Sequence, residues 1–256
     1  MISIDLFKTE DMKEDILFMS EFKEIFNELC RTQDRSIIWN NWLDYCININ
    51  LMQTRSQYAP HNFYENEEEY YQMFTEWIQM LNNELENHPY IDFIGRLYED
   101  NVQSKGKAKD FQQYYTPTNV TTVVNDLIVT RESKGFASDP CCGSGRMLLA
   151  AHVKSQGKLI CVGQDLDETS CKMAVLNFLS HGVRGSVLHM NTLEGTFYKG
   201  WRVNRWLLHG IPVPHIEEIY NPGDAYDFIG DDYERNKGNV TNNPPMKKEG
   251  KQTTLI

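Results

Sequence analysis

The segment from Phe136 to Met147 most constrains the fold, because it joins a strand pattern, a glycine turn and a helix pattern. A short apolar run ends at Asp139-Pro140, and the tight turn Gly143-Ser-Gly145 follows. A helical pattern of apolar residues then begins at Met147. A strand, a glycine turn and a helix in this order let the backbone approach a nucleotide-like ligand at the helix N-terminus. The segment therefore predicts a ligand site within an α/β fold.

The sequence around this segment alternates between strand and helix patterns. Two further buried strands and the helix between them are expected at Leu159–Gly163, Ser186–Met190 and Glu168–Ser180. Upstream, Thr118 or Asn119 is suited to cap a helix that runs to Ile128. Strands separated by helices of this length predict a parallel, doubly wound sheet.

Residues 1–104 differ from the rest of the chain in charge and in periodicity. They hold 20 acidic and 7 basic residues, a net charge of −13, whereas residues 105–256 hold 16 and 18, a net charge of +2; together these give the −11 of the chain. Apolar residues recur at helical spacing between positions 10 and 100. We therefore expect an acidic helical domain over 1–104, joined by the basic stretch Lys105–Lys109 to a second domain over 105–256. The acidic part is either a solvated surface or a docking face for a basic partner.

Composition excludes several classes of protein. No apolar run approaches the roughly 20 residues that span a bilayer, and the first residues lack the pattern of a secretory signal. The six cysteines form no Cys-x-x-Cys pair, which favours neither a zinc site nor a disulfide scaffold. We expect reduced thiols, no metal site, no membrane contact and a cytoplasmic location, in a bacterium or a phage-infected host cell.

Polar residues follow the three expected strands at the edge where α/β sheets bind ligands. Asp139 precedes the glycine turn, Asp165 is suited to accept hydrogen bonds from ribose hydroxyls, and Asn191 is suited to bond an adenine edge. A dinucleotide site would need a third glycine, but Arg146-Met-Leu148 follows the turn. The pattern therefore favours a nucleoside ligand without pyrophosphate.

Four motifs together resemble the adenine-N6 DNA methyltransferases. They are Asp139-Pro-Cys-Cys-Gly-Ser-Gly145, Phe111-Gln-Gln-Tyr-Tyr-Thr-Pro117, Gly163-Gln-Asp-Leu-Asp167 with its helix to Gly182, and Ile91-Asp-Phe-Ile-Gly-Arg-Leu-Tyr98. The chain is most similar to the methylase subunits of type I restriction-modification systems and their short phage relatives, over roughly residues 90–195. The resemblance implies a Rossmann-like fold that binds S-adenosylmethionine.

The resemblance also implies a set of cofactor-binding residues. Tyr115, Thr116 and Pro117 would close over the methionine part of S-adenosylmethionine. Its amino and carboxyl groups would contact Asp139, Cys141 and the backbone of Gly143 and Gly145. Asp165 would bind the ribose, and Asn191 would lie near the adenine ring.

The catalytic loop of this family reads Asp/Asn/Ser-Pro-Pro-aromatic, and the chain has Asn243-Pro244-Pro245-Met246. The first side chain and a proline carbonyl would accept hydrogen bonds from the N6 amine of a flipped adenine. Met246 replaces the aromatic ring that stacks on this base, and the preceding Gly238–Asn242 is a poor strand pattern. Trp201, Trp206 and Tyr220 offer an alternative stacking surface, although aromatic residues of this kind more often belong to a core.

The reaction implied is transfer of a methyl group to adenine N6 in DNA, with protection of phage or mobile-element DNA as a role by analogy. Sequence specificity would come from the helical part, a specificity subunit or a homodimer. One alternative is a catalytically impaired cofactor-binding protein that docks a host defence or DNA-binding protein through its acidic helices. A further alternative is methylation of RNA or of a protein glutamine.

Overall fold

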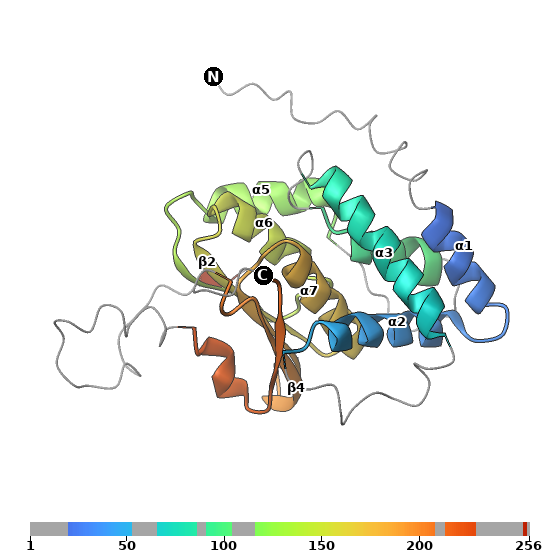
Figure 1. Cartoon of the computed structure of the whole chain (residues 1–256). Helices are drawn as coiled ribbons and strands as arrows, with labels where there is room; N and C mark the ends of the chain where they lie inside the picture. Colours follow the sequence, from blue (N-terminus) through green and yellow to red (C-terminus); the bar gives the residue numbers. More distant parts are fainter. Residues whose placement is uncertain are drawn as a thin grey trace, which may run out of the picture.

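The protein is described by a computed structural model in which helices cover a six-stranded sheet (Figure 1). The described residues are 20–52, 66–85, 91–103, 116–207, 213–228 and 253–254. The helices are α1 (Ser20–Leu29), α2 (Arg35–Ile49), α3 (Glu67–Glu84), α4 (Phe93–Tyr98), the π-helix η3 (Glu99–Gln103), α5 (Thr118–Ile128), α6 (Arg146–Lys154), α7 (Glu168–Ser180) and the 3-10 helix η5 (Pro222–Tyr226). The strands are β1 (Gly135–Asp139), β2 (Leu159–Asp165), β3 (Gly185–Asn191), β4 (Thr196–Val203), β5 (Ile216–Ile219) and β6 (Thr253–Thr254).

The sheet has the order β5-β4-β3-β2-β1-β6, and it is mixed. Strands β1, β2, β3 and β6 are parallel, which agrees with the expected β1-α6-β2-α7-β3 unit. Strand β4 runs antiparallel to both of its neighbours, β3 and β5, so the prediction of a wholly parallel sheet is wrong on that side. The cause is the short connection from Asn191 to Thr196, because a tight hairpin can join only antiparallel strands. The α/β class with a Rossmann-like unit is confirmed.

Helices α6 and α7 lie on the same face of the sheet. Both crossovers run in the same direction, from β1 to β2 and from β2 to β3, and right-handed connections then put both helices on one side. Leu148 of α6 and Phe178 of α7 share a core cluster with Cys161 and Val187 of the strands. On the opposite face, Ala225 of η5 belongs to a smaller cluster with other strand residues. Among the described residues, the second face is therefore covered by η5 and not by a long helix.

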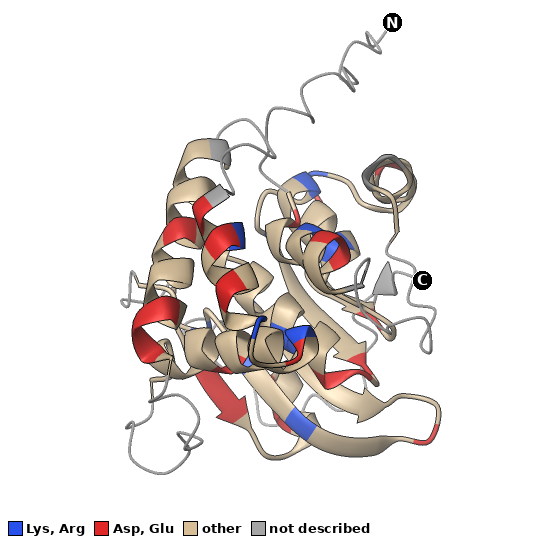
Figure 2. Ribbon diagram, turned by 90° about the vertical axis from the view of Figure 1, so that its right-hand side faces the viewer, with Lys and Arg blue, Asp and Glu red and all other residues tan. Residues whose placement is uncertain are grey.

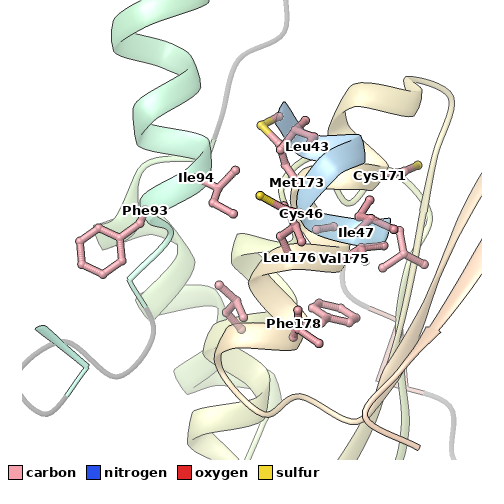
Figure 3. Packing of buried hydrophobic residues seen from close by; sticks show 14 of the residues in the cluster. Leu43, Cys46, Ile47, Phe93, Ile94, Cys171, Met173, Val175, Leu176 and Phe178 are labelled. Carbon is pink, nitrogen blue, oxygen red and sulfur yellow. The ribbon is translucent and has the colours of Figure 1, made fainter. Parts of the chain in front are cut away.

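The N-terminal part is helical, as its periodicity predicts, and it packs directly on the α/β part. Figure 3 shows side chains of α2 against side chains of α7. Among the labelled residues, Leu43, Cys46 and Ile47 belong to α2, and Cys171, Met173, Val175, Leu176 and Phe178 belong to α7. Polar contacts tie the same two helices: Lys172 Nζ lies 2.9 Å from an oxygen of Asp44, and Thr169 Oγ1 donates to Asn40 Oδ1 at 3.0 Å. The domain division at residue 104 stays a prediction, and Lys105–Lys109 lie outside the described residues.

The aromatic side chains of the N-terminal helices form their core. Phe22, Trp39 and Trp42 are fully buried, and Phe22 meets Trp42 edge to face with ring centroids 5.1 Å apart. Trp77 of α3 packs on Trp42 in the same way. The acidic residues lie on the outside of α1 and α3, where Asp and Glu outnumber Lys and Arg (Figure 2).

Two helix starts show how local sequence fixes the elements. The carboxylate of Asp167 accepts a hydrogen bond from the N–H of Ser170 at 2.9 Å, and α7 then runs over the predicted range. Helix α5 begins at Thr118 with Pro117 at the N-cap position and no side-chain cap. The predicted N-cap at Thr118 or Asn119 is therefore wrong, because the N-cap position is one or two residues earlier, at Pro117, whose φ is fixed by its ring.

None of the described helices is long and apolar enough to cross a membrane. All six cysteines lie in the described ranges and are free. Within those ranges, no cluster of three or more His, Cys, Asp or Glu residues is arranged to hold a metal ion.

Candidate functional site

The glycine turn connects β1 to α6 with a backbone that only glycine adopts easily. Gly143 has a φ of 55° and Gly145 a φ of 85°, both in the left-handed region. A Cβ on Gly145 would lie 3.2 Å from the ring of Phe178 and 3.3 Å from Cβ of Ala174. The turn therefore packs tightly on α7 at the carboxyl edge of the sheet, and the N–H of Gly145 donates to the carbonyl of Cys142 at 2.8 Å.

Asp139 and Asp165 end adjacent parallel strands and lie at the same edge. Asp139 Oδ1 accepts a hydrogen bond from the N–H of Cys141 at 3.1 Å, and Asp165 Oδ2 accepts one from the N–H of Gly143 at 2.8 Å. Both carboxylates thus hold successive parts of one turn. Burial raises the pKa of Asp139 to about 6, against the lowering effect of its bond from Cys141, and the charge of Asp165 raises it further. Burial also raises the pKa of Asp165.

These two carboxylates give the edge a negative potential. Neither has a cationic partner at hydrogen-bond distance among the described residues. A carboxylate offers about four lone-pair positions, and Asp165 uses Oδ1 for the N–H of Asp167 at 2.9 Å besides its bond to Gly143. The arrangement suits a ligand that carries a positive charge and hydroxyl groups.

Cys141 and Asn191 complete the rim. The thiol of Cys141 is exposed, and its pKa is raised by partial burial and by the charges of Asp165 and Asp139. Asn191 Oδ1 accepts hydrogen bonds from the N–H groups of Leu193 and Glu194, at 3.1 and 3.2 Å, and so closes the turn between β3 and β4. The oxygen of Asn191 is therefore engaged in the turn, although its strand end lies where the sequence predicts.

Thr192 links the end of β3 to the glycine turn, a contact that the sequence analysis missed. Its hydroxyl lies 3.2 Å from the carbonyl of Pro140 and 3.2 Å from Oε1 of Gln164. The three strand ends thus contact one another through side chains. A threonine just after a strand carries no signal of such a role in the sequence.

Thr116 also lies beside the glycine turn, as the resemblance implies for its motif. The guanidinium of Arg146 donates from Nη1 to the carbonyl oxygen of Thr116 at 2.8 Å. Pro117 is exposed and precedes α5. Tyr115 of the same motif lies outside the described residues.

A buried polar group behind the turn was not among the predicted site residues. The carboxylate of Asp92 accepts hydrogen bonds from the Ser144 hydroxyl, from Arg146 Nε at 3.0 Å and from Asn177 Nδ2 at 2.7 Å. A signal for it exists in two places. Asp92 precedes Gly95 by three residues, which is typical of a helix cap, and Arg146 is a cation at a helix start, where it needs an anion.

The predicted catalytic loop cannot be compared with this geometry, because Asn243, Pro244, Pro245 and Met246 lie outside the described residues, as does Gly238–Asn242. Of the alternative stacking residues, Trp201 is a core residue with 1% of its surface exposed. Trp206 is partly buried and donates from Nε1 to Glu217 at 2.8 Å. Tyr220 is 71% exposed.

Comparison with known proteins supports the resemblance. Residues 90–204 match the family described as N-6 DNA Methylase. Over 96 residues the chain is 32% identical to the type I restriction enzyme MjaVIII methylase subunit of Methanocaldococcus jannaschii. This alignment covers 36% of this chain and 16% of that protein. The chain thus spans only a small part of this curated relative. The predicted similarity to type I methylase subunits is confirmed for this segment.

A solved structure is also similar over part of its length. It is the type I restriction-modification system methyltransferase subunit from Streptococcus thermophilus, with a TM-score of 0.34 and 17% identity. The similarity covers 72% of this chain and 57% of that chain.

Proposed function

We propose that this chain, whose residues 90–204 match the N-6 DNA Methylase family, transfers a methyl group from S-adenosylmethionine to N6 of adenine in DNA. The observation that carries the proposal is the pair of carboxylates, buried Asp139 and half-buried Asp165, that hold the glycine turn at the carboxyl edge of the sheet. The family match implies a methyl donor, and the chemistry of this edge favours S-adenosylmethionine.

The residues at the edge fit such a donor. S-adenosylmethionine carries an ammonium group, a sulfonium and two ribose hydroxyls, and carboxylates are the natural partners of all three kinds of group. Asp139 and Asp165 provide the carboxylates, and each keeps acceptor capacity beyond its bonds to the turn. The left-handed glycines Gly143 and Gly145 shape the turn that lies beside these carboxylates, and Gly145 lets it pack against α7.

In the proposed complex, Asp139 would bind the amino group and Asp165 the ribose hydroxyls. Cys141 and the backbone of Gly143 and Gly145 would contact the amino acid part, and Asn191 would lie near the adenine ring. Tyr115, Thr116 and Pro117 would close over the methionine part.

The bound cofactor supplies an electrophilic methyl group, so the protein needs chiefly to position the acceptor amine. We propose that Asn243 and a carbonyl of Pro244 or Pro245 accept hydrogen bonds from the N6 amine, which orients its lone pair. The adenine must leave the duplex to reach this site, and Met246 would contact the flipped base in place of an aromatic ring.

We propose the methyl acceptor and the partners on the basis of the family match. DNA is the acceptor that the family name implies, and a specificity subunit or a second copy of the chain would supply sequence recognition. The comparisons do not favour the alternatives of a purely binding role or of RNA or protein methylation.

The proposal is tested by transfer of labelled methyl from S-adenosylmethionine to unmethylated DNA. Asp165→Ala and Asn243→Ala are compared with the wild type, and Asn221→Ala is the matched control. Asn221 also precedes a proline, but its side chain only accepts from the N–H of Gly223 at 3.0 Å. We expect N6-methyladenine with the wild type and with Asn221→Ala, and its loss with the other two variants.

Two results would contradict the proposal in different ways. Label in RNA or protein but not in DNA would exclude the acceptor. Calorimetric binding of S-adenosylmethionine without transfer to any acceptor, with or without added partner subunits, would support the binding role instead.

A further inference from the structure

Arg146 connects the two segments that form the walls of the proposed cofactor site, namely the glycine turn Gly143–Gly145 and the segment at Thr116. We propose that the buried pair Asp92–Arg146 is a positioning pair that fixes Thr116 against the glycine turn and thereby sets the affinity for the methyl donor. This inference rests on the proposed function, since it concerns the same site. Neither residue would touch the reacting atoms.

The Asp92 carboxylate is the shared acceptor of the hydrogen bonds around this pair. Its side chain is completely buried. It accepts hydrogen bonds from four groups: the Ser144 hydroxyl, Arg146 Nε at 3.0 Å, Asn177 Nδ2 at 2.7 Å and the N–H of Gly95 at 2.7 Å. One carboxylate therefore joins α4, the glycine turn, α6 and α7.

The position of Arg146 is unusual on electrostatic grounds. It is the first residue of α6, where the helix dipole disfavours a positive charge, and only 10% of its side chain is exposed. A buried guanidinium at this end of a helix needs an anion, and Asp92 supplies the buried one, with Glu99 3.7 Å from Nη2 on the more exposed side. The chain thus keeps a costly cation at a place where an uncharged residue would form the helix more easily.

The geometry indicates what this cation does. Arg146 uses Nε for Asp92 and Nη1 for the carbonyl of Thr116, at 3.0 and 2.8 Å. The planar guanidinium serves the two acceptors from two separate nitrogens in fixed directions, whereas lysine carries its three N–H donors on one nitrogen and would have to reach both acceptors from a single point. Thr116 and Arg146 are 30 positions apart in the sequence, so this bond directly links the segment at Thr116 to the glycine turn.

Asn177 extends the link to α7. Its Nδ2 donates to Asp92 and also to the carbonyl of Ser144 at 2.8 Å, so the middle residue of the turn is held through both its hydroxyl and its carbonyl. A ligand that binds between Thr116 and the turn then meets walls that are already in place. Binding costs less ordering free energy when the site is preorganised.

The test is the affinity of Arg146→Lys for S-adenosylmethionine, measured by calorimetry. Arg202→Lys is a closely matched control. Arg202 is equally buried, pairs with Glu217 at 3.1 Å and donates to the carbonyl of Asp224 at 2.7 Å, but it lies on β4. We expect the dissociation constant to rise about tenfold in Arg146→Lys, as for one lost charge-assisted hydrogen bond, and to be unchanged in Arg202→Lys.

A second variant distinguishes a loss of affinity from a loss of folding. Asp92→Asn with Arg146→Met removes the two buried charges together, and the Glu99 carboxylate that remains is 33% exposed to solvent. We expect it to fold, by circular dichroism, and to bind S-adenosylmethionine at least as weakly as Arg146→Lys. A purely structural role predicts instead a lower melting temperature with the wild-type dissociation constant at 25 °C.

The outcomes separate the inference from the proposed function. If the wild type binds S-adenosylmethionine and both Arg146 variants bind it equally well, the inference is wrong and the proposed function stands. If the wild type does not bind it, the proposed function fails and the inference fails with it. A tenfold loss in Arg202→Lys as well would overturn the inference, because the effect would not depend on the site.

Discussion

The backbone N–H of Gly143 donates a hydrogen bond to Asp165 Oδ2 at 2.8 Å, so the carboxylate that ends β2 fastens the turn that follows β1. The two residues are far apart in sequence, yet the parallel pairing of β1 and β2 brings them together, since Asp139 is in register with Gly163. One side chain can therefore shape the turn and remain available to a ligand at the same edge. This relationship motivates the first prediction.

Asp165→Asn should weaken binding of S-adenosylmethionine by about 1.5–3 kcal/mol, the range for a hydrogen bond to a charged group. The amide keeps one acceptor but loses the charge and the second acceptor. Calorimetric titration measures the change. Asp167→Ala is the control, because Asp167 caps α7 and should cost about 1 kcal/mol of stability without altering affinity. Equal affinity losses in the two variants would contradict the role of Asp165.

Binding of S-adenosylmethionine should weaken as the pH falls below 6. Burial raises the pKa of Asp139 to about 6, and only the ionised carboxylate attracts the ammonium group of the ligand. The affinity should therefore be constant above this pKa and fall by up to about tenfold per pH unit below it. Titrations at several pH values measure the profile. Asp139→Asn should bind weakly with a flat profile over the same range, and an unchanged slope in this variant would assign the titration to another group.

The fold itself should lose stability as the pH falls, through His152. Burial lowers the pKa of His152 to about 4, and the nearby His181 lowers it further. The unfolded chain has a histidine pKa near 6.5, so it binds more protons than the folded protein between these two values. The free energy of unfolding should fall by about 2 kcal/mol from pH 7.5 to pH 5 because of this residue.

Urea unfolding at the two pH values tests this, with His152→Leu beside the wild type. The difference between the two proteins isolates His152, because other titrating groups such as Asp139 are common to both. A wild type and a variant with the same pH dependence would show that His152 is not buried in the neutral form.

Asp44→Asn should destabilise the packing of α2 on α7. Lys172 is buried with 7% of its side chain exposed, and Asp44 lies 2.9 Å from its ammonium group. Removing one partner leaves a largely buried charge, which should cost about 2 kcal/mol after allowance for the partial exposure of Asp44. Thermal unfolding measures the change.

Glu168→Gln is the control for this pair. Glu168 also lies near Lys172, at 3.4 Å, but it is 45% exposed, so its loss should cost less than about 0.5 kcal/mol. Similar losses in the two variants would mean that the contact between the helices contributes little.

Local patterns predicted the elements whose formation depends on neighbours in sequence. Helix α7 matches its predicted range because Asp167 caps it and its apolar residues have helical spacing. The glycine turn was also predicted, since the left-handed φ angles of Gly143 and Gly145 require that residue type. Asp139 and Asp165 were predicted to lie at one edge because parallel strands end on the same side of a sheet.

Strands β4 and β5 were not predicted, because their formation depends on pairing. Strand β4 contains Lys199 and Gly200, and it has no clear alternation of polar and apolar residues. It forms by pairing with β3, where Gly200 lies opposite Leu188 and a Cβ would approach the Leu188 side chain to 2.8 Å. The absence of a side chain at Gly200 is thus required by contact with Leu188, a residue of another strand.

The sequence by itself determined the order of elements around the glycine turn, the polar residues at the strand ends and the family resemblance over roughly residues 90–195. These depend on short-range propensities and on motifs that are contiguous in the chain. Only the tertiary structure decided that Asp92 lies between Ser144, Arg146 and Asn177. The reason is physical: burial and ion pairing between distant residues arise when the helices pack, and a single sequence carries no periodic signal for them.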